Sequence, residues 1–219
     1  MIKAVIFDMD GLMIDATSTY VDAETRLLKQ FNKEYSHEIR KKYMGKRISG
    51  MLETMIQEYD LPITQEEAEK TLRKYVRENF YRSSVTLLPG CGRLVNSLTE
   101  SKNYVMAVAS SSPKEIIEIV IERFGFKDVF EVLVSSEEVK NGKPAPDVFL
   151  YCAELLHISP ASCLVLEDGP LGIVAAKRAG MKTIAVYNKK INKPEDFSNM
   201  PDRIFSSLEE VTLDVVTSL

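Results

Sequence analysis

Short apolar segments alternate with amphipathic ones over most of the chain. Residues 3–7 (KAVIF) run from one lysine into four consecutive apolar side chains, and comparable segments occur later. Continuous apolar runs of this length are typical of strands buried on both faces of a parallel sheet. The predicted strands are residues 3–7, 104–109, 132–135, 163–167 and 182–187.

Helical patterns lie between these strands. Residues 114–124 (KEIIEIVIERF) place their apolar side chains on one face, and residues 146–157 and 170–179 are also predicted to be helical. Gly180 is expected to end the last of these helices. Strands that alternate with helices predict right-handed crossovers and therefore an α/β fold with a doubly wound, Rossmann-like parallel sheet.

One long segment interrupts this alternation. Residues 17–82 contain helical patterns but no strand pattern, and Thr64 opens the sequence TQEE, which predicts a capping box. Pro89 and Gly90 mark the return to the α/β pattern. The expected organisation is a core domain of residues 1–15 and 89–219, with an inserted helical cap domain, similar to a four-helix bundle, at residues 16–88.

The composition is that of an ordinary globular protein of 219 residues, with 45% hydrophobic and 27% charged residues. Because 28 basic residues face 32 acidic ones, the net charge is −4, and a nucleic-acid partner is not expected. No apolar run approaches the length of a membrane helix or of a signal-peptide core, so no membrane partner is expected. The three cysteines, an odd number without metal-ligand spacing, favour a reducing compartment and hence the cytoplasm.

Polar residues that could take part in catalysis or binding follow several predicted strands. Asp8 and Asp10 come directly after the first strand, and Gly11 allows the backbone to turn sharply. Ligands of open α/β sheets bind at the carboxyl ends of the strands, so both aspartates are candidates for a site there. The alternative is a solvated, aspartate-rich turn.

Serines follow the second predicted strand. Ser112 is a candidate N-cap for the helix at 114–124, which would bring Ser110 and Ser111 beside a helix N-terminus that favours anions. The alternative is that these serines only cap the helix. Lys143, in the loop after the third strand, could supply a positive charge to a phosphate, or it could be an ordinary solvated lysine.

Two further carboxylates, Glu167 and Asp168, end the fourth predicted strand. If they converge with Asp8 and Asp10, four acids share a small volume and repel one another unless a cation is present. Carboxylate oxygens are ligands that suit Mg²⁺, so the sequence predicts Mg²⁺ as the cofactor.

The chain resembles the haloacid dehalogenase superfamily of aspartate-nucleophile phosphotransferases over essentially its whole length. Four motifs occur in that superfamily's order: Asp8-Met9-Asp10-Gly11 with Asp15, then Ser110, then Gly142-Lys143-Pro144, then Glu167-Asp168. The helical insert resembles the subclass I cap of the β-phosphoglucomutase-like phosphatases. The resemblance implies a phosphatase that acts on small phosphorylated metabolites such as sugar or nucleoside monophosphates.

The resemblance also implies roles for the motif residues. Asp8 would attack phosphorus and form an aspartyl-phosphate, and Asp10 would act as general acid and then as general base. Mg²⁺ would bind Asp8, the main-chain carbonyl of Asp10 and Asp168, with Glu167 as a ligand or as a partner of one. The phosphoryl oxygens would be held by Ser110 and Lys143, and the candidate phosphate-binding set also includes Gly11 and Ser111.

The cap would select the substrate, a small phosphate ester, and close over the site. Its candidate contact residues are Lys46 and Arg47 in the loop Gly45-Lys46-Arg47, and the alternative is a solvated basic helix end. A monomer is the simplest expectation for an enzyme whose lid must move.

Three other functions stay open at this point. A phosphosugar mutase would use the same chemistry, but Tyr20 stands near a position where the related mutases have histidine, which favours a phosphatase. A dehalogenase would have no need of Asp10. A non-catalytic protein that binds phosphate esters would not need all four motifs.

Overall fold

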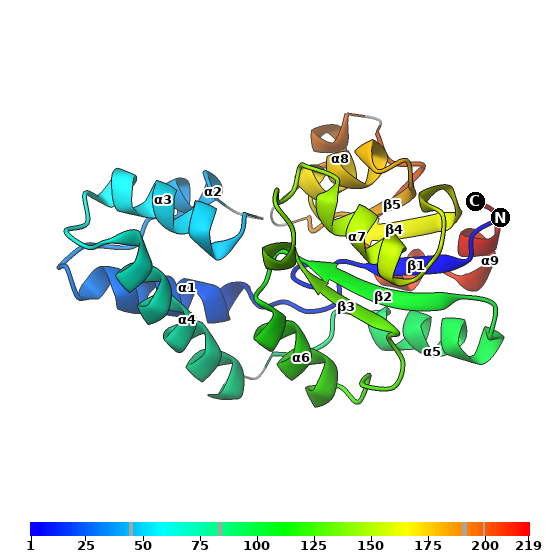
Figure 1. Ribbon diagram of the computed structural model, residues 1–219, viewed down its shortest axis with the longest axis horizontal. Helices are drawn as coiled ribbons and strands as arrows, with labels where there is room; N and C mark the ends of the chain where they lie inside the picture. The colour runs from blue at the N-terminus through cyan, green and yellow to red at the C-terminus, as the bar shows by residue number, and fades with distance from the viewer. Residues whose placement is uncertain (44–45, 83–84, 190–191, 199) are drawn as a thin grey trace. The chain divides into compact units, whose positions relative to one another are not determined.

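The computed structural model describes residues 1–43, 46–82, 85–189, 192–198 and 200–219 (Figure 1). The chain forms two compact units, one of Met1–Asp15 with Thr86–Leu219 and one of Ala16–Val85. The first unit thus resumes three residues before the expected boundary at residue 89. The reason is local pairing, because the Leu88 amide donates to the Met13 carbonyl (2.8 Å) and Leu87 forms a β-bridge with Ile14.

Among the described residues, the first unit contains a six-stranded parallel sheet in the order β3-β2-β1-β4-β5-β6. The strands are β1 (Ala4–Phe7), β2 (Val105–Ser110), β3 (Val132–Ser135), β4 (Cys163–Glu167), β5 (Lys182–Val186) and β6 (Arg203–Phe205). The first five strands and the doubly wound parallel sheet confirm the prediction. The sequence did not predict β6, because this three-residue edge strand is largely exposed and has no continuous apolar run.

Helices cover both faces of the sheet, with α7 and α8 on one face and α5 and α6 on the other (Figure 1). The longer helices are α5 (Cys91–Ser101), α6 (Lys114–Arg123), α7 (Asp147–Leu155), α8 (Pro170–Arg178) and α9 (Leu213–Thr217). Short 3₁₀ turns are η1 (Ser136–Glu138), η2 (Pro160–Ser162), η3 (Pro194–Phe197) and η4 (Leu208–Glu210). The helices predicted after β2, β3 and β4 are confirmed as α6, α7 and α8.

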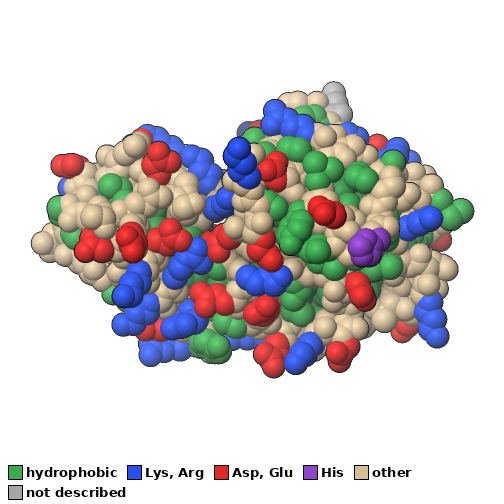
Figure 2. Space-filling view, viewed as in Figure 1, with side chains coloured by type: hydrophobic (Ala, Val, Ile, Leu, Met, Phe, Trp, Pro, Cys, Tyr) green, Lys and Arg blue, Asp and Glu red, His purple; other side chains and the backbone are tan. Residues whose placement is uncertain are grey.

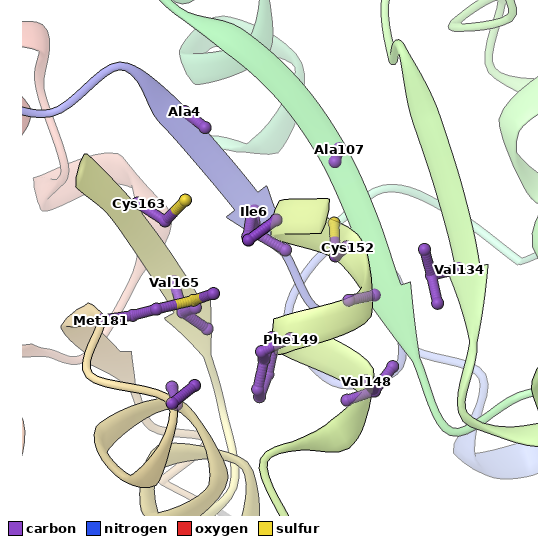
Figure 3. Close-up of a cluster of buried hydrophobic side chains, with 14 of the residues drawn as sticks. Ala4, Ile6, Ala107, Val134, Val148, Phe149, Cys152, Cys163, Val165 and Met181 are labelled. Atoms are coloured by element: carbon purple, nitrogen blue, oxygen red, sulfur yellow. The ribbon is translucent and has the colours of Figure 1, made fainter. Parts of the chain in front are cut away.

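A cluster of buried apolar side chains packs between the sheet and the helices α7 and α8 (Figure 3). Ala4 and Ile6 of β1 belong to this cluster together with Phe149 and Cys152 of α7. Because side chains alternate along a strand, the next position after Ala4 and Ile6 on this face is Asp8. The packed core therefore fixes the direction in which the first candidate catalytic residue points.

The described part of the second unit is helical, as the sequence predicts. Its helices are α1 (Thr17–Lys29), α2 (His37–Lys41), α3 (Ile48–Tyr59) and α4 (Gln65–Arg82). The predicted capping box is present at the start of α4, where the Glu67 amide donates to Thr64 Oγ1 (3.3 Å) and the Thr64 amide donates to Glu67 Oε2 (3.2 Å). Tyr20 of α1 packs edge-to-face on Phe80 of α4, with ring centroids 5.7 Å apart.

Charged side chains of both signs are interspersed over the face drawn in Figure 2, as expected for a chain with a small net charge. Within the described residues, none of the helices has both the length and the apolar character needed to cross a membrane.

Candidate active site

The carboxyl ends of the three central strands bring the candidate residues to one edge of the sheet. Ser110 is the last residue of β2, Glu167 is the last residue of β4, and Asp8 directly follows β1. The Asp8 amide continues the ladder by donating to the Leu166 carbonyl (2.9 Å). Parallel strands in this register deliver their C-terminal side chains to one place, although the residues lie far apart in sequence.

Lys143 joins two of these strand ends through its ammonium group. Its Nζ donates to Asp8 Oδ1 (2.6 Å), to Glu167 Oε1 (2.9 Å) and to the carbonyl of Ala109 (3.3 Å). The three donors of the ammonium thus meet three acceptors. The side chains of Lys143, Asp8 and Glu167 are between 3% and 8% exposed, so this is a buried charge network and not a surface pair.

The third carboxylate of the site is Asp168. One carboxylate oxygen from each of Asp8, Glu167 and Asp168 lies within 4.8 Å of the others. Burial, together with neighbouring carboxylates, raises the pKa of Asp8 to about 7 although Lys143 lowers it. Burial and the charges of Glu167 and Asp8 also raise the pKa of Asp168 well above its ordinary value. One ammonium therefore does not neutralise three converging acids.

The charge on Lys143 is stable in this environment. Burial lowers the pKa of its ammonium, but the carboxylates of Asp8 and Glu167 outweigh that effect and hold the pKa above its ordinary value. Lys143 is therefore a permanent positive charge at the carboxyl edge of the sheet.

The Lys143 loop is supported from both sides. The carbonyl of Pro144, the next residue, accepts a hydrogen bond from Arg178 Nη1 (3.0 Å). Asp147 Oδ2 accepts from both the amide and the side-chain nitrogen of Asn141, each at 3.0 Å. The side chain of Lys143 is thus presented by a braced segment.

Two glycines make room for the acidic residues. Gly11 has φ +92°, and a Cβ there would lie 2.0 Å from Asp168 Oδ2. Its amide donates to the carbonyl of Ile14 (2.8 Å), which closes the turn after β1. A Cβ at Gly172 of α8 would lie 1.6 Å from Glu167 Oε1. Both carboxylates thus occupy space that only a glycine leaves free.

Glu167 is held by donors at both of its oxygens. Oε1 accepts from Lys143, and Oε2 accepts from the amide of Gly169 (2.6 Å). The next residue, Asp168, is fixed by its main chain, because its carbonyl accepts from Asn192 Nδ2 (3.1 Å). Hydrogen bonds therefore hold the side chain of Glu167 and the main chain of Asp168.

The serine segment after β2 differs in detail from the prediction. Helix α6 begins at Lys114 and its N-cap residue is Pro113, not the expected Ser112. Ser112 instead donates through its hydroxyl to Asp10 Oδ2 (2.5 Å), and its amide donates to the Ser110 hydroxyl (3.1 Å). The reason is tertiary: the end of β2 lies beside the turn after β1, so this hydroxyl meets the carboxylate of Asp10. Ser111 between them is half-buried.

The cap candidates belong to the second unit. Lys46 is exposed, and its Nζ donates to Thr54 Oγ1 (3.3 Å). Arg47 is the N-cap residue of α3, and no described residue accepts a hydrogen bond from its buried Nε and Nη2 atoms. Gly45, the first residue of the candidate loop, lies outside the described residues.

Sequence reasoning missed three residues that shape the site. Gly172, Asn192 and Ser135 touch Glu167, Asp168 and the Ser112 carbonyl respectively. A glycine inside the predicted helix at 170–179 was the one available signal, since such glycines often mark a close approach. Nothing in the local sequence marks Asn192 or Ser135.

The chain is similar to known proteins over most of its length. The pattern of the haloacid dehalogenase-like hydrolases matches residues 5–186. A probable pseudouridine-5′-phosphatase of Drosophila melanogaster is 32% identical over 196 residues, which cover 86% of this chain and 83% of the relative. Hexitol phosphatase B of Escherichia coli K12 is 31% identical over 214 residues, which cover 96% of this chain and 95% of the relative.

A solved structure shows the same fold. The crystal structure of CbbY from Rhodobacter sphaeroides in complex with phosphate aligns with a TM-score of 0.90 at 20% identity, over 99% of this chain and 100% of that chain. The family match and the fold together define a hydrolase built on a doubly wound sheet. The chain belongs to the haloacid dehalogenase-like hydrolase family, and the two relatives named above are phosphatases.

Proposed function

We propose that this protein is a Mg²⁺-dependent phosphatase that hydrolyses small phosphorylated metabolites through an aspartyl-phosphate on Asp8. The observation that carries the proposal is the buried network in which Lys143 joins Asp8 and Glu167 beside Asp168. Phosphoryl transfer depends mostly on positioning and on neutralising charge, and this network supplies a fixed carboxylate next to a permanent cation.

The reaction has two balanced halves. First, an Asp8 carboxylate oxygen forms a bond to phosphorus while the bond to the ester oxygen breaks, and Asp10 gives its proton to the departing oxygen. Second, water attacks the phosphorus of the aspartyl-phosphate and gives a proton to Asp10, while the bond to the Asp8 oxygen breaks. Inorganic phosphate leaves, and both aspartates return to their starting states.

The residues present fit a magnesium ion. The donor set consists of carboxylate oxygens, which Mg²⁺ prefers, and burial together with neighbouring carboxylates raises the pKa values of Asp8 and Asp168. Asp8, Asp168 and the main-chain carbonyl of Asp10 would hold the ion. When bound, the ion neutralises negative charge on the phosphoryl group and on the acids. Because both oxygens of Glu167 accept from other groups, its proposed role is to position Lys143.

Ser110, Ser111 and Lys143 are the proposed phosphate-binding residues. The Ser110 hydroxyl accepts from the Ser112 amide, which leaves its own proton to donate to a phosphoryl oxygen. Gly11 is proposed to contribute space and not a hydrogen bond, because its amide already donates to Ile14.

The proposed substrates are sugar phosphates or nucleoside monophosphates. The names of the two relatives, a pseudouridine-5′-phosphatase and a hexitol phosphatase, support this class. In the cap, two buried guanidinium atoms of Arg47 have no acceptor among the described residues, which supports a role in binding a polar or anionic group because buried donors without partners are costly. Lys46 is the second proposed contact. The protein is proposed to act as a monomer in the cytoplasm.

A mutase remains the second candidate, because it would use the same two aspartates and return the phosphoryl group to the sugar. Tyr20 disfavours it, since it stands near a position where the related mutases have histidine, and its ring packs on Phe80. A mutase would need a bisphosphate activator and would release no inorganic phosphate from its substrate. Product analysis therefore separates the two candidates.

The test is inorganic phosphate release from a panel that includes pseudouridine 5′-phosphate, hexose phosphates and glycerol 3-phosphate. Each substrate is measured with Mg²⁺ and with EDTA, for the wild type and for Asp8→Asn, which keeps the shape of the side chain. Release that requires Mg²⁺ and disappears in Asp8→Asn supports the proposal. Release that persists in Asp8→Asn would refute the role of Asp8.

A further inference from the structure

Ser112 contacts the residue proposed as general acid and base. Its hydroxyl lies 2.5 Å from Asp10 Oδ2, and Ser112 is almost fully buried, with 6% exposure of the residue. The two residues are 102 positions apart in sequence. The contact is therefore created by the fold and is not a consequence of local helix capping.

The main chain of Ser112 is held by hydroxyl groups from two neighbouring strands. Its amide donates to Ser110 Oγ (3.1 Å), and its carbonyl accepts from Ser135 Oγ (2.7 Å). Ser110 and Ser135 end β2 and β3 as partners in the sheet register. Ser112 is thus fixed from β2 and β3 while it contacts the turn after β1.

Ser135 is itself firmly placed. It is fully buried, its amide donates to Glu138 Oε2 (2.6 Å), and its hydroxyl accepts from the Glu137 amide (3.1 Å). Because that hydroxyl accepts from Glu137, its own proton is directed to the Ser112 carbonyl. The position of the Ser112 side chain is therefore set by the sheet and not by a loose surface segment.

We propose that Ser112 is a positioning residue, whose hydroxyl holds the Asp10 carboxyl group in the orientation that proton transfer requires. This inference rests on the proposed function, because it assumes that Asp10 serves the leaving oxygen and then the water. The residue acts through Asp10, and no bond to phosphorus forms or breaks at Ser112.

A hydroxyl group suits this task for a chemical reason. It can donate to Asp10 Oδ2 in both the carboxylate and the acid form, while the other oxygen of Asp10 carries the proton, so it keeps its contact in both halves of the reaction. The net proton count of Ser112 does not change, since Asp10 alone passes the proton.

The experiment compares two substrates that differ in their need for an acid. An alkyl phosphate, such as the best metabolite of the panel, leaves as an alkoxide that must be protonated. The substrate p-nitrophenyl phosphate leaves as a stabilised phenolate that needs no proton. The value of kcat/KM reports the steps up to loss of the leaving group. The ratio of kcat/KM for the alkyl phosphate to kcat/KM for p-nitrophenyl phosphate therefore measures acid catalysis alone.

Ser112→Ala is expected to lower kcat/KM for the alkyl phosphate by about tenfold to a hundredfold, a part of what a general acid contributes. The value for p-nitrophenyl phosphate should change by less than about threefold. Ser112→Thr, which keeps the hydroxyl, should retain the wild-type ratio. Ser207→Ala removes a hydroxyl that caps η4 away from these residues and serves as the matched control with an unchanged ratio.

The outcomes distinguish the positioning role of Ser112 from the proposed phosphatase function. Equal losses for both substrates in Ser112→Ala, or no loss for either, would overturn the positioning role while the phosphatase stands. A wild type that releases no phosphate from either substrate would instead overturn the proposed function. If Ser112→Ala does not fold, Ser112→Cys, with a similar volume and a weak donor, is measured in the same way, and an unchanged ratio there rejects the role.

Discussion

Replacing Gly172 by alanine should destabilise the protein, although the same change in an ordinary helix position stabilises. Gly172 lies in α8 and is buried. A Cβ at this position would lie 1.6 Å from Glu167 Oε1 and 2.0 Å from its Cδ, whereas real Cβ contacts essentially never fall below 3.0 Å. The carboxylate of Glu167 must therefore move by more than about 1 Å.

The magnitude follows from what Glu167 loses when it moves. Its bonds to Lys143 (2.9 Å) and to the Gly169 amide (2.6 Å) are too short to survive such a shift. Hydrogen bonds to charged groups contribute about 1.5–3 kcal/mol each, and alanine recovers about 1 kcal/mol of helix preference. The expected net loss is about 2–5 kcal/mol of the free energy of unfolding.

The assay is urea unfolding followed by circular dichroism in metal-free buffer, with Gly92→Ala as the matched control. Gly92 lies in α5 of the same unit, and a Cβ there would meet only Leu87 Cδ1 at 3.6 Å, an ordinary contact. Gly92→Ala should therefore be neutral or stabilise by up to about 1 kcal/mol. A Gly172→Ala protein as stable as Gly92→Ala would refute the claim that Glu167 is rigidly held.

Three further predictions test other parts of the structure. Lys143→Met should lower the free energy of unfolding by about 3–5 kcal/mol in chemical unfolding, because it leaves Asp8 and Glu167 buried without their cation. Adding Asp8→Asn should recover part of the loss. Full stability of Lys143→Met would contradict the network. Saturating Mg²⁺ should raise the Tm of the wild type by about 5–10 °C in a thermal-shift assay, and Asp168→Asn should abolish most of that rise. An equal rise in the wild type and in Asp168→Asn would exclude Asp168 as a ligand. Burial raises the pKa of Glu24 above its ordinary value, despite Arg40 and Tyr43, so its folded form keeps a proton that the unfolded chain has lost. The stability of the wild type relative to Glu24→Gln should therefore fall as pH rises above the ordinary value of 4.5, and a constant difference between unfolding curves at several pH values would contradict this.

The first five strands of the core were predictable from sequence because most of their residues are buried and form short apolar runs. Residues 163–167, for example, form a continuous apolar run that ends in Glu167, and every residue of β4 is buried. The edge strand β6 was not predictable in this way, since Arg203 and Ile204 are exposed and carry no periodic signal. Buried residues give an apolar run in the sequence, which the edge strand β3 keeps and the exposed edge strand β6 lacks.

The convergence of Asp8, Lys143 and Glu167 could also be anticipated, because each follows or ends a strand of one parallel sheet. The hydrogen bond between Ser112 and Asp10 could not be predicted from the sequence. A serine before a proline and a helix looks locally like a cap, and only the register of β1 beside β2 brings Asp10 to its hydroxyl. Likewise, the need for glycine at position 172 depends on where the Glu167 side chain lies. Contacts of this kind belong to the tertiary structure.

The most direct test of the central claim is to look for the phosphoryl group on Asp8. Asp10→Asn can accept a phosphoryl group from p-nitrophenyl phosphate without an acid, but it has no base to activate water, so the intermediate should accumulate. We expect a burst of one p-nitrophenol per enzyme, together with mass-spectrometric localisation of the phosphoryl group to Asp8 after acid quench. Turnover by the wild type, with neither a burst nor a modified Asp8 in Asp10→Asn, would contradict the account.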